Sequence, residues 1–243
     1  MLRGRIGNEK GIAVLALAPM MVGILAVVGL AIDAGILYLV KSKLSAAVDA
    51  GALAGTRALA RGMNSAEQEL KAKQIAQSYV KLNFPQQYMF TSNLTVPTPT
   101  ISLSTVSQRR LTLEASVQVP TLFLSTLGLT DSVVRASAIA SRRDVNILLV
   151  LDRSGSMSGA CSDLKQAAKG FVVKFAEGRD KLGMVSFATS SGVDYALADN
   201  FKTSSPDLAT MIDGINCNGW TNTGQALAQG YSELVRIDEP NSL

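Results

Sequence analysis

The sequence predicts an α/β protein in which an N-terminal transmembrane helix continues into an α+β stalk domain, followed by a doubly wound α/β domain. Three observations predict it. Residues 11–32 carry no charge, apolar and polar residues alternate in segments between 93 and 141, and strand and helix patterns alternate after residue 145. We therefore divide the chain into an anchor with a long amphipathic helix (1–62), a stalk domain (63–142) and a C-terminal domain (143–243).

The amino-acid composition of the chain excludes several classes of function. The chain is 47% apolar and 17% charged, which excludes a disordered protein. Its net charge of +4 is spread without runs of like charge, so we expect no nucleic-acid partner. The absence of histidine excludes Ser-His-Asp and Cys-His catalysis. Two cysteines are too few for a zinc site, which leaves one disulfide or two ordinary buried thiols.

The uncharged run at residues 11–32 is long enough to cross a membrane. Its 22 residues would span about 33 Å as a helix. The run is longer than the core of a secretory signal, and no small-x-small cleavage site follows it. We therefore expect an uncleaved, single-pass anchor.

Flanking cations set the expected orientation. The positive-inside rule places a short basic N-terminal tail in the cytoplasm, with most of the chain outside. The cations on the far side nearly balance those of the tail, but the short length of the tail and its proximity to the span favour the N-terminus inside. The tail carries Arg3, Arg5 and Lys10, and the far side carries Lys41, Lys43 and Arg57.

Asp33 ends the apolar run. One interpretation is a carboxylate at the outer membrane interface, which requires no polar partner. The other is a carboxylate that lies deeper and requires a polar partner. Because Asp33 falls near the expected membrane edge, we adopt the first interpretation.

The helical pattern continues beyond Asp33 to about Arg61, which predicts one long helix with an amphipathic second half. Gly51 and Gly55 form a G-x-x-x-G pair in this Ala-rich stretch. The pair reflects either close helix packing or chance, and the sequence leaves both open. The apolar face comprises Ile36, Leu37, Val40, Leu44, Ala47, Val48, Ala52 and Leu59.

The stretch "AIDAGILYLVKSKLSAAVDAGALAGTRAL" resembles the N-terminal region of tight-adherence (Flp) pilus-assembly proteins of the TadE/TadG-like type. The matching features are the apolar span, Asp-Ala-Gly at 33–35, Lys-Ser-Lys-Leu at 41–44 and Val-Asp-Ala at 48–50. This resemblance implies a bacterial inner-membrane protein of pilus assembly.

The middle of the chain predicts a helix followed by antiparallel strands. The helix covers residues 64–82 and carries Leu70, Ile75, Tyr79 and Leu82. The strands lie around 93–104, 109–119 and 131–141. Between the last two strands, "PTLFLSTLGLT" at 120–130 is either a cover for the local core or a partner-contact loop. We expect a cover, because a large exposed apolar patch is unusual. The order of these elements extends the TadE/TadG-like resemblance to about residue 141.

The C-terminal region begins with "VNILLVLD", the apolar pattern of a buried central strand. In the following "DRSGSM", the alternation of Asp152, Ser154 and Ser156 can direct three oxygens to one point, as a hard divalent cation requires. A polar turn that caps the next helix explains the same spacing, and spacing alone does not decide between them. The further elements expected are a helix at 161–176, strands at 181–188 and 194–198, and helices at 206–212 and 223–235.

A second loop, "GWTNTGQAL" at 219–227, places Thr221 just before a helix. Together with "LLVLDRSGSM" it closely resembles the von Willebrand factor A domain and its metal-ion-dependent adhesion site. The resemblance implies that Asp152, Ser154, Ser156 and Thr221 bind Mg²⁺, or Mn²⁺ or Ca²⁺. It also implies that an acidic group of a partner protein completes the coordination. Adhesion rather than turnover is then expected, with no small-molecule substrate.

The chain departs from that family at its end. A further Asp, in an apolar-strand context, and the remaining strands would follow Leu243. Asp238 and Glu239 lie in a polar segment and do not replace that Asp. We therefore expect a partial A domain, a fragment of a longer protein, with a weakened metal site. In an A-domain arrangement Cys161 and Cys217 share one rim, so a disulfide between them is expected outside the cytoplasm.

These observations predict a non-enzymatic, membrane-anchored pilus-assembly or adhesion protein that binds a partner through the metal site. The alternative is a structural component of an envelope complex with an inactive A-domain remnant. A metal-dependent phosphohydrolase with Asp152 as nucleophile is disfavoured, because that chemistry needs a second nearby acid and "DRSGSM" offers none.

Overall fold

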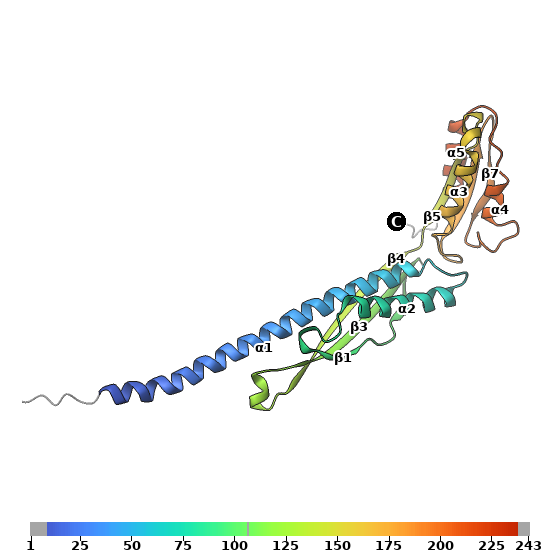
Figure 1. The fold of residues 1–243 in the computed structure, drawn as a ribbon. Helices are drawn as coiled ribbons and strands as arrows, with labels where there is room; N and C mark the ends of the chain where they lie inside the picture. The colour runs from blue at the N-terminus through green and yellow to red at the C-terminus, as the bar shows by residue number, and fades with distance from the viewer. Residues whose placement is uncertain (1–8, 106, 238–243) are drawn as a thin grey trace, which may run out of the picture.

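The computed structural model describes residues 9–105 and 107–237. Arg3, Arg5, Asp238 and Glu239, which enter the predictions above, lie outside the described residues. A long helix runs along a four-stranded sheet, and a second, three-stranded domain lies at the opposite end of the molecule from the start of that helix (Figure 1).

Helix α1 (Glu9–Ala58) is continuous over 50 residues, through Pro19 and past Asp33, as the sequence predicted. Its part from Pro19 to Ala58 is long and apolar enough to cross a membrane, with a mean hydropathy of 2.3 in its most apolar window. Apolar side chains before Asp33, such as Leu25 and Leu30, are exposed, whereas Val40 and Leu44 beyond it are buried. The helix therefore changes near Asp33 from a largely exposed surface to a packed one.

Helix α2 (Ser65–Asn83) packs on α1 through small residues. Asn64 caps it by accepting the Glu67 N–H at 2.9 Å. A Cβ added at Gly51 would lie 2.8 Å from the Ala76 carbonyl oxygen, and one at Gly55 would lie 2.9 Å from that of Ala72. The glycine pair thus permits close helix packing, which the sequence had left open.

The buried face of α2 differs from the apolar residues that marked the helix in the sequence. Leu70, Tyr79 and Leu82 are exposed. Where α1 approaches α2 at its two glycines, the residues opposite are Ala72, Ala76 and Val80, so the small-residue side of α2 faces inward. The buried residues of α2 are Gln68, Ala72, Ala76 and Val80.

The stalk sheet is antiparallel, with β3 at its centre. Strand β4 (Asp131–Arg143) pairs with β3 (Gln108–Pro120) over its whole length, from Gln108 opposite Arg143 to Pro120 opposite Asp131. Strands β1 (Ser92–Thr95) and β2 (Thr100–Thr105) share the other edge of β3, after a short 3₁₀ turn, η1 (Tyr88–Phe90). The predicted alternation is confirmed, because Leu111, Leu113, Ala115, Val117 and Val119 of β3 are buried with residues of α1 and α2.

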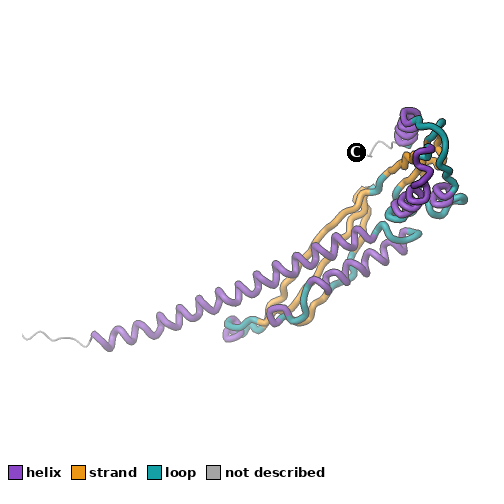
Figure 2. Tube along the Cα trace, turned by 45° about the horizontal axis from the view of Figure 1, so that its top comes forward, coloured by secondary structure: helices purple, strands orange, loops and turns teal. Residues whose placement is uncertain are grey.

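One prediction about this region is wrong, and another is incomplete. The β3–β4 loop, with the 3₁₀ turn η2 (Leu124–Leu127), does not cover a core: Leu127 is 78% and Leu129 58% exposed. The hairpin extends past the packed layer and lies beside the apolar half of α1 (Figure 2). Asp33 also has polar partners that the adopted interpretation did not require, because it is 2% exposed and accepts three backbone N–H groups from this loop.

The C-terminal domain has helices on both faces of its sheet, as a doubly wound fold requires. Strand β5 (Asn146–Asp152) pairs in parallel with β6 (Lys181–Phe187), and β6 pairs antiparallel with β7 (Ser191–Ala198). Helices α3 (Cys161–Val172) and α4 (Leu208–Asp213) pack with Leu151, Leu182 and Met184. Helix α5 (Thr223–Arg236) packs with Val185 and Phe187 on the other face.

A buried polar joint connects this domain to the stalk domain. The Gln68 side-chain amide donates to the Glu177 carbonyl oxygen at 2.8 Å and accepts from Arg109 at 2.9 Å. Arg142 of β4 pairs with Asp180, which is fully buried. The predicted domain boundary near residues 141–144 is therefore a segment whose side chains take part in contacts between the two domains.

Candidate metal-binding site

Asp152 is the last residue of β5, and the loop after it gathers three side-chain oxygens. The Asp152 carboxylate accepts the Ser154 N–H at 2.8 Å. The Ser154 hydroxyl is buried and lies 3.0 Å from the Ser156 hydroxyl. The 3₁₀ turn η3 (Gly155–Ala160) then leads into α3. These contacts bring Asp152, Ser154 and Ser156 to one rim of the sheet.

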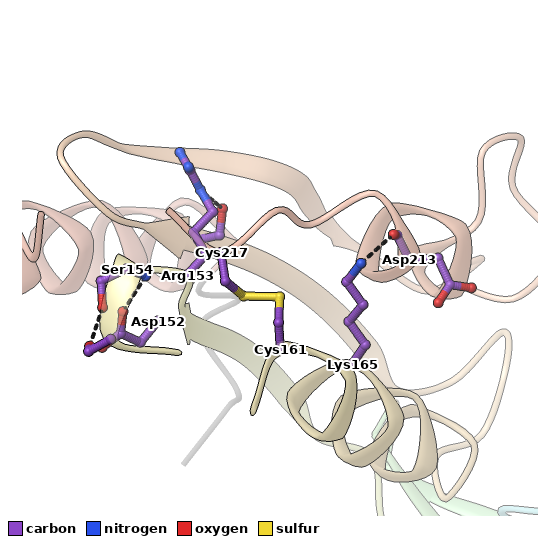
Figure 3. The surroundings of a disulfide bond; sticks show 9 residues. Asp152, Arg153, Ser154, Cys161, Lys165, Asp213 and Cys217 are labelled. Carbon is purple, nitrogen blue, oxygen red and sulfur yellow. Dashed lines mark hydrogen bonds between the residues drawn. A yellow bond between two sulfur atoms is a disulfide. The ribbon is translucent and has the colours of Figure 1, made fainter. Parts of the chain in front are cut away.

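Arg153 points to the other side of this loop. Its backbone N–H donates to the Phe187 carbonyl, and its Nε donates to the Ser186 hydroxyl at 3.0 Å. Figure 3 shows the Asp152 carboxylate and the Ser154 hydroxyl together, with the Arg153 side chain directed away from both. Because successive residues of the loop point to opposite sides, the guanidinium of Arg153 lies away from the oxygens of Asp152 and Ser154.

The loop between α4 and α5 is bonded directly to this first loop. The Asn218 N–H donates to the Arg153 carbonyl at 2.8 Å, and the Gly155 N–H donates to the Gly219 carbonyl at 2.9 Å. Gly219 has a φ of +88°, and a Cβ there would lie 2.7 Å from the Thr189 hydroxyl. Only glycine satisfies both constraints.

A disulfide adds a covalent link between the two loops. It joins Cys161, the first residue of α3, to Cys217, with a Cα–Cα distance of 6.0 Å (Figure 3). The bond closes a sequence separation of 56 residues, for which chain entropy gives roughly 4 kcal/mol of stabilisation. Both loops are therefore held in one arrangement.

Thr221 is carried on the second loop and is exposed. The Trp220 N–H before it donates to the Thr189 hydroxyl at 3.0 Å, and the Asn222 N–H after it donates to the Ala188 carbonyl at 2.8 Å. These two backbone hydrogen bonds fix the Thr221 loop beside the β6–β7 turn, at the same rim as the first loop.

The β6–β7 turn is a third component of the rim that sequence reasoning missed. Thr189 of this turn holds the Thr221 loop by its hydroxyl. The available signal was "FATSS", a run of hydroxyl residues at the carboxyl end of a buried strand that pairs with β5. Such strand ends meet at one edge of the sheet.

The donor set fits a hard cation. A carboxylate and hydroxyls are ligands that Mg²⁺ accepts while it keeps several waters. Within the described residues, no group of three or more Asp, Glu, Cys or His side chains is placed to hold a metal. The site therefore supplies a single negative charge, from Asp152.

Comparisons with known proteins give the same two-part composition. Residues 147–241 match the family model of the von Willebrand factor type A domain. Residues 11–61 match the model of putative Flp pilus-assembly TadE/G-like proteins. The chain thus joins a TadE/G-like segment to a von Willebrand factor type A domain, and both resemblances are confirmed over these residues, whereas the extension of the TadE/TadG-like resemblance to about residue 141 stays a prediction.

Solved structures match at low similarity. An uncharacterized membrane-spanning protein from Vibrio fischeri is 20% identical, with a TM-score of 0.35, over 40% of this chain and 52% of its own. A von Willebrand factor type A protein from Catenulispora acidiphila is 19% identical, with a TM-score of 0.33, over 49% and 25%. The type V pili tip protein Mfa5 from Porphyromonas gingivalis is 15% identical, with a TM-score of 0.34, over 59% and 24%. This chain spans about half or less of each. No curated protein matches it.

Proposed function

We propose that this protein is a non-enzymatic pilus-assembly or adhesion component, anchored in the bacterial inner membrane, that binds a partner protein through a divalent cation. The observation that carries the proposal is the convergence of Asp152, Ser154 and Ser156 on a rim to which the Thr221 loop is bonded. Mg²⁺, Mn²⁺ or Ca²⁺ would be held by these residues, and the cation supplies an open coordination position when bound.

Charge balance supports an acidic partner. A divalent cation beside one carboxylate keeps a net positive charge, so a carboxylate from another protein is favoured in the open position. Because this chain contributes only one carboxylate to the site, we expect it to bind the cation weakly by itself.

The disulfide supports the orientation with an N-terminus in the cytoplasm. Disulfides form in the periplasm and persist there, whereas the cytoplasm keeps thiols reduced. Because Cys161 and Cys217 lie beyond α1, a disulfide between them favours a C-terminal domain outside the cytoplasm.

The test is Mn²⁺ binding to the full chain in detergent, with free and bound Mn²⁺ distinguished by electron paramagnetic resonance. We expect Asp152→Ala to abolish binding, because it removes the only carboxylate among the proposed ligands. Asp163→Ala is the matched control, since Asp163 is an exposed carboxylate in the first turn of α3. Equal binding by both variants would refute the metal site.

A structural role in an envelope complex is the second candidate. The buried joint at Gln68, Arg142 and Asp180 favours it, because it holds the two domains together without a cation. Under this alternative, Asp152→Ala still co-purifies with the same envelope proteins as the unchanged chain, whether or not the chain binds Mn²⁺. Under the adhesion proposal, the acidic partner is lost together with Mn²⁺.

A further inference from the structure

The β3–β4 loop, residues 121–130, presents apolar side chains over which no described residue packs closely enough to bury them. No charged side chain occurs between residues 115 and 130. Such a cluster at the tip of a hairpin is unusual for a surface in water. The exposed fractions are 49% for Leu122, 45% for Phe123, 78% for Leu127 and 58% for Leu129.

The loop is fixed against α1 at the end of the uncharged run. The Asp33 carboxylate accepts the N–H groups of Leu122, Phe123 and Leu124 at 2.8, 3.0 and 2.7 Å. A Cβ added at Gly29 would lie 2.5 Å from the Phe123 ring. Gly29 is one helical turn, about 6 Å, from Asp33 toward the membrane-spanning segment. The apolar side chains are therefore held at the level of that segment.

Charged residues begin on the other side of this level. The ammonium of Lys41, the first cation of α1 after the uncharged run, donates to the backbone carbonyl of Arg135 in β4. Asp131 starts β4 at the base of the loop. The uncharged end of the hairpin thus adjoins the uncharged half of α1, and the charged parts of both elements adjoin each other.

We infer that the 121–130 loop enters the membrane beside α1, with Leu122, Phe123, Leu127 and Leu129 in the boundary between headgroups and acyl chains. The occupant of this apolar surface is lipid, because the surface is continuous with exposed apolar residues of α1 such as Leu25 and Leu30. An insertion of about 6 Å falls within the depth that amphipathic elements reach in this boundary. The inference rests on the membrane anchor of the proposed function, but not on its metal site.

A second membrane contact restrains the stalk domain. A single helix leaves the rest of a protein free to tilt and rotate about its exit point. The hairpin tip, joined to α1 at Asp33, fixes the sheet relative to the membrane and so fixes the direction in which the C-terminal domain is presented.

The test uses the single tryptophan of the chain. In a Trp220→Phe background, Leu127→Trp or Leu129→Trp places one fluorophore on the loop. The full chain is reconstituted in phosphatidylcholine–phosphatidylglycerol vesicles with or without lipid brominated on its acyl chains. Leu70→Trp is the matched control, because Leu70 is 57% exposed, similar to Leu129, and lies in the half of α2 nearer the C-terminal domain.

We expect brominated lipid to weaken the loop emission roughly twofold or more, and to leave that of Leu70→Trp unchanged. Loop emission no more quenched than that of Leu70→Trp would overturn the inference. A second result would also overturn it: loop emission that is blue-shifted but not quenched by brominated lipid, with a blue shift that disappears when the protein is diluted in lipid. That result would indicate a second copy of the chain as the occupant. Leu25→Trp reports on the anchor: if it is not quenched, the anchor and the inference both fail, whereas Mn²⁺ binding tests the metal site separately.

Asp33 is a positioning residue in this arrangement. Asp33→Ala should raise the hydrogen-exchange rates of the Leu122, Phe123 and Leu124 amides by roughly tenfold or more and reduce the quenching at Leu127→Trp. Asp49→Ala, at an exposed carboxylate of the same helix, should change neither. Unchanged exchange and quenching in Asp33→Ala would show that Asp33 does not hold the loop.

Discussion

Single carboxylates fix several loops and elements of this protein by accepting backbone N–H groups. Asp33 does so for the hairpin loop, and Glu233 does so for β7. The Glu233 carboxylate accepts the Leu197 N–H at 2.8 Å and pairs with Arg236 at 2.6 Å. The hydrogen bond from Arg236, together with that from Leu197, lowers the pKa of Glu233 below its ordinary value of 4.5 despite its burial. Ionised Glu233 therefore stabilises the contact between α5 and β7.

The lowered pKa of Glu233 predicts that the protein loses stability as the pH falls. A group with a depressed pKa stabilises the fold fully above its unfolded pKa, and this stability is lost as the pH falls through the folded pKa. The free energy of unfolding of the full chain, measured by urea titration from about pH 7 to about pH 3, should therefore decline below the ordinary pKa of 4.5. Glu233→Gln should make this decline shallower. Glu114→Gln, at an exposed residue of β3, should leave it unchanged, and identical profiles for both variants would contradict the role of Glu233.

The helices of the stalk domain depend on small residues. At Gly51 and Gly55 the added Cβ atoms would lie 2.7–2.9 Å from atoms of α2 and β3, closer than packed atoms can approach. At Gly35, in the same helix, a Cβ would meet no atom within 4 Å. Gly51 and Gly55 thus differ from Gly35 in how closely other atoms pack on them, whereas the helix propensity of glycine is the same at all three positions.

Alanine substitutions should separate these two effects. Gly51→Ala should lower the free energy of unfolding by about 1–3 kcal/mol, because it forces α1 and α2 apart. Gly35→Ala should leave it unchanged or raise it by about 0.5–1 kcal/mol, since alanine favours a helix. Urea unfolding of the full chain in detergent, followed by circular dichroism, measures both. A stabilised Gly51→Ala protein would show that the close approach is not required.

The two domains are joined by a network of buried charges and amides. The Asp180 carboxylate pairs with Arg142 and accepts the N–H groups of Ala176 at 2.6 Å and Val145 at 3.1 Å. Nearby, Asp144 pairs with Arg179 at 2.6 Å, although burial raises the pKa of Asp144 against this attraction. A network of this kind, spread over both domains, transmits the orientation of the stalk domain to the C-terminal domain.

Removing Asp180 should uncouple the domains. Asp180→Ala removes one of the two carboxylates that pair with Arg142 and leaves Asp144 at 3.3 Å, so the expected loss is below the about 3–5 kcal/mol of a buried pair broken outright. Differential scanning calorimetry of the full chain should then show two separated transitions in place of a coupled one. Asp199→Ala is the matched control, because Asp199 is exposed and uses its backbone carbonyl to accept the Gly178 N–H. A single, unshifted transition in Asp180→Ala would contradict the coupling.

The sequence by itself determined the features that local spacing encodes. The 22 uncharged residues of the anchor, the period-2 pattern of β3 and the alternation of Asp152, Ser154 and Ser156 each depend on neighbours within a few positions. These patterns were sufficient for the fold class and for the first loop of the candidate site.

Only the tertiary structure decided what each face contacts. The partners of Asp33 lie 89 to 91 residues away, and Gln68 reaches Glu177 across 109. Periodicity shows that residues share a face but not what covers it, so it could not predict the exposed 121–130 loop, the alanine side of α2 or the role of Thr189. Those features depend on which segments meet in space, and that is fixed when the helices, sheets and loops pack together.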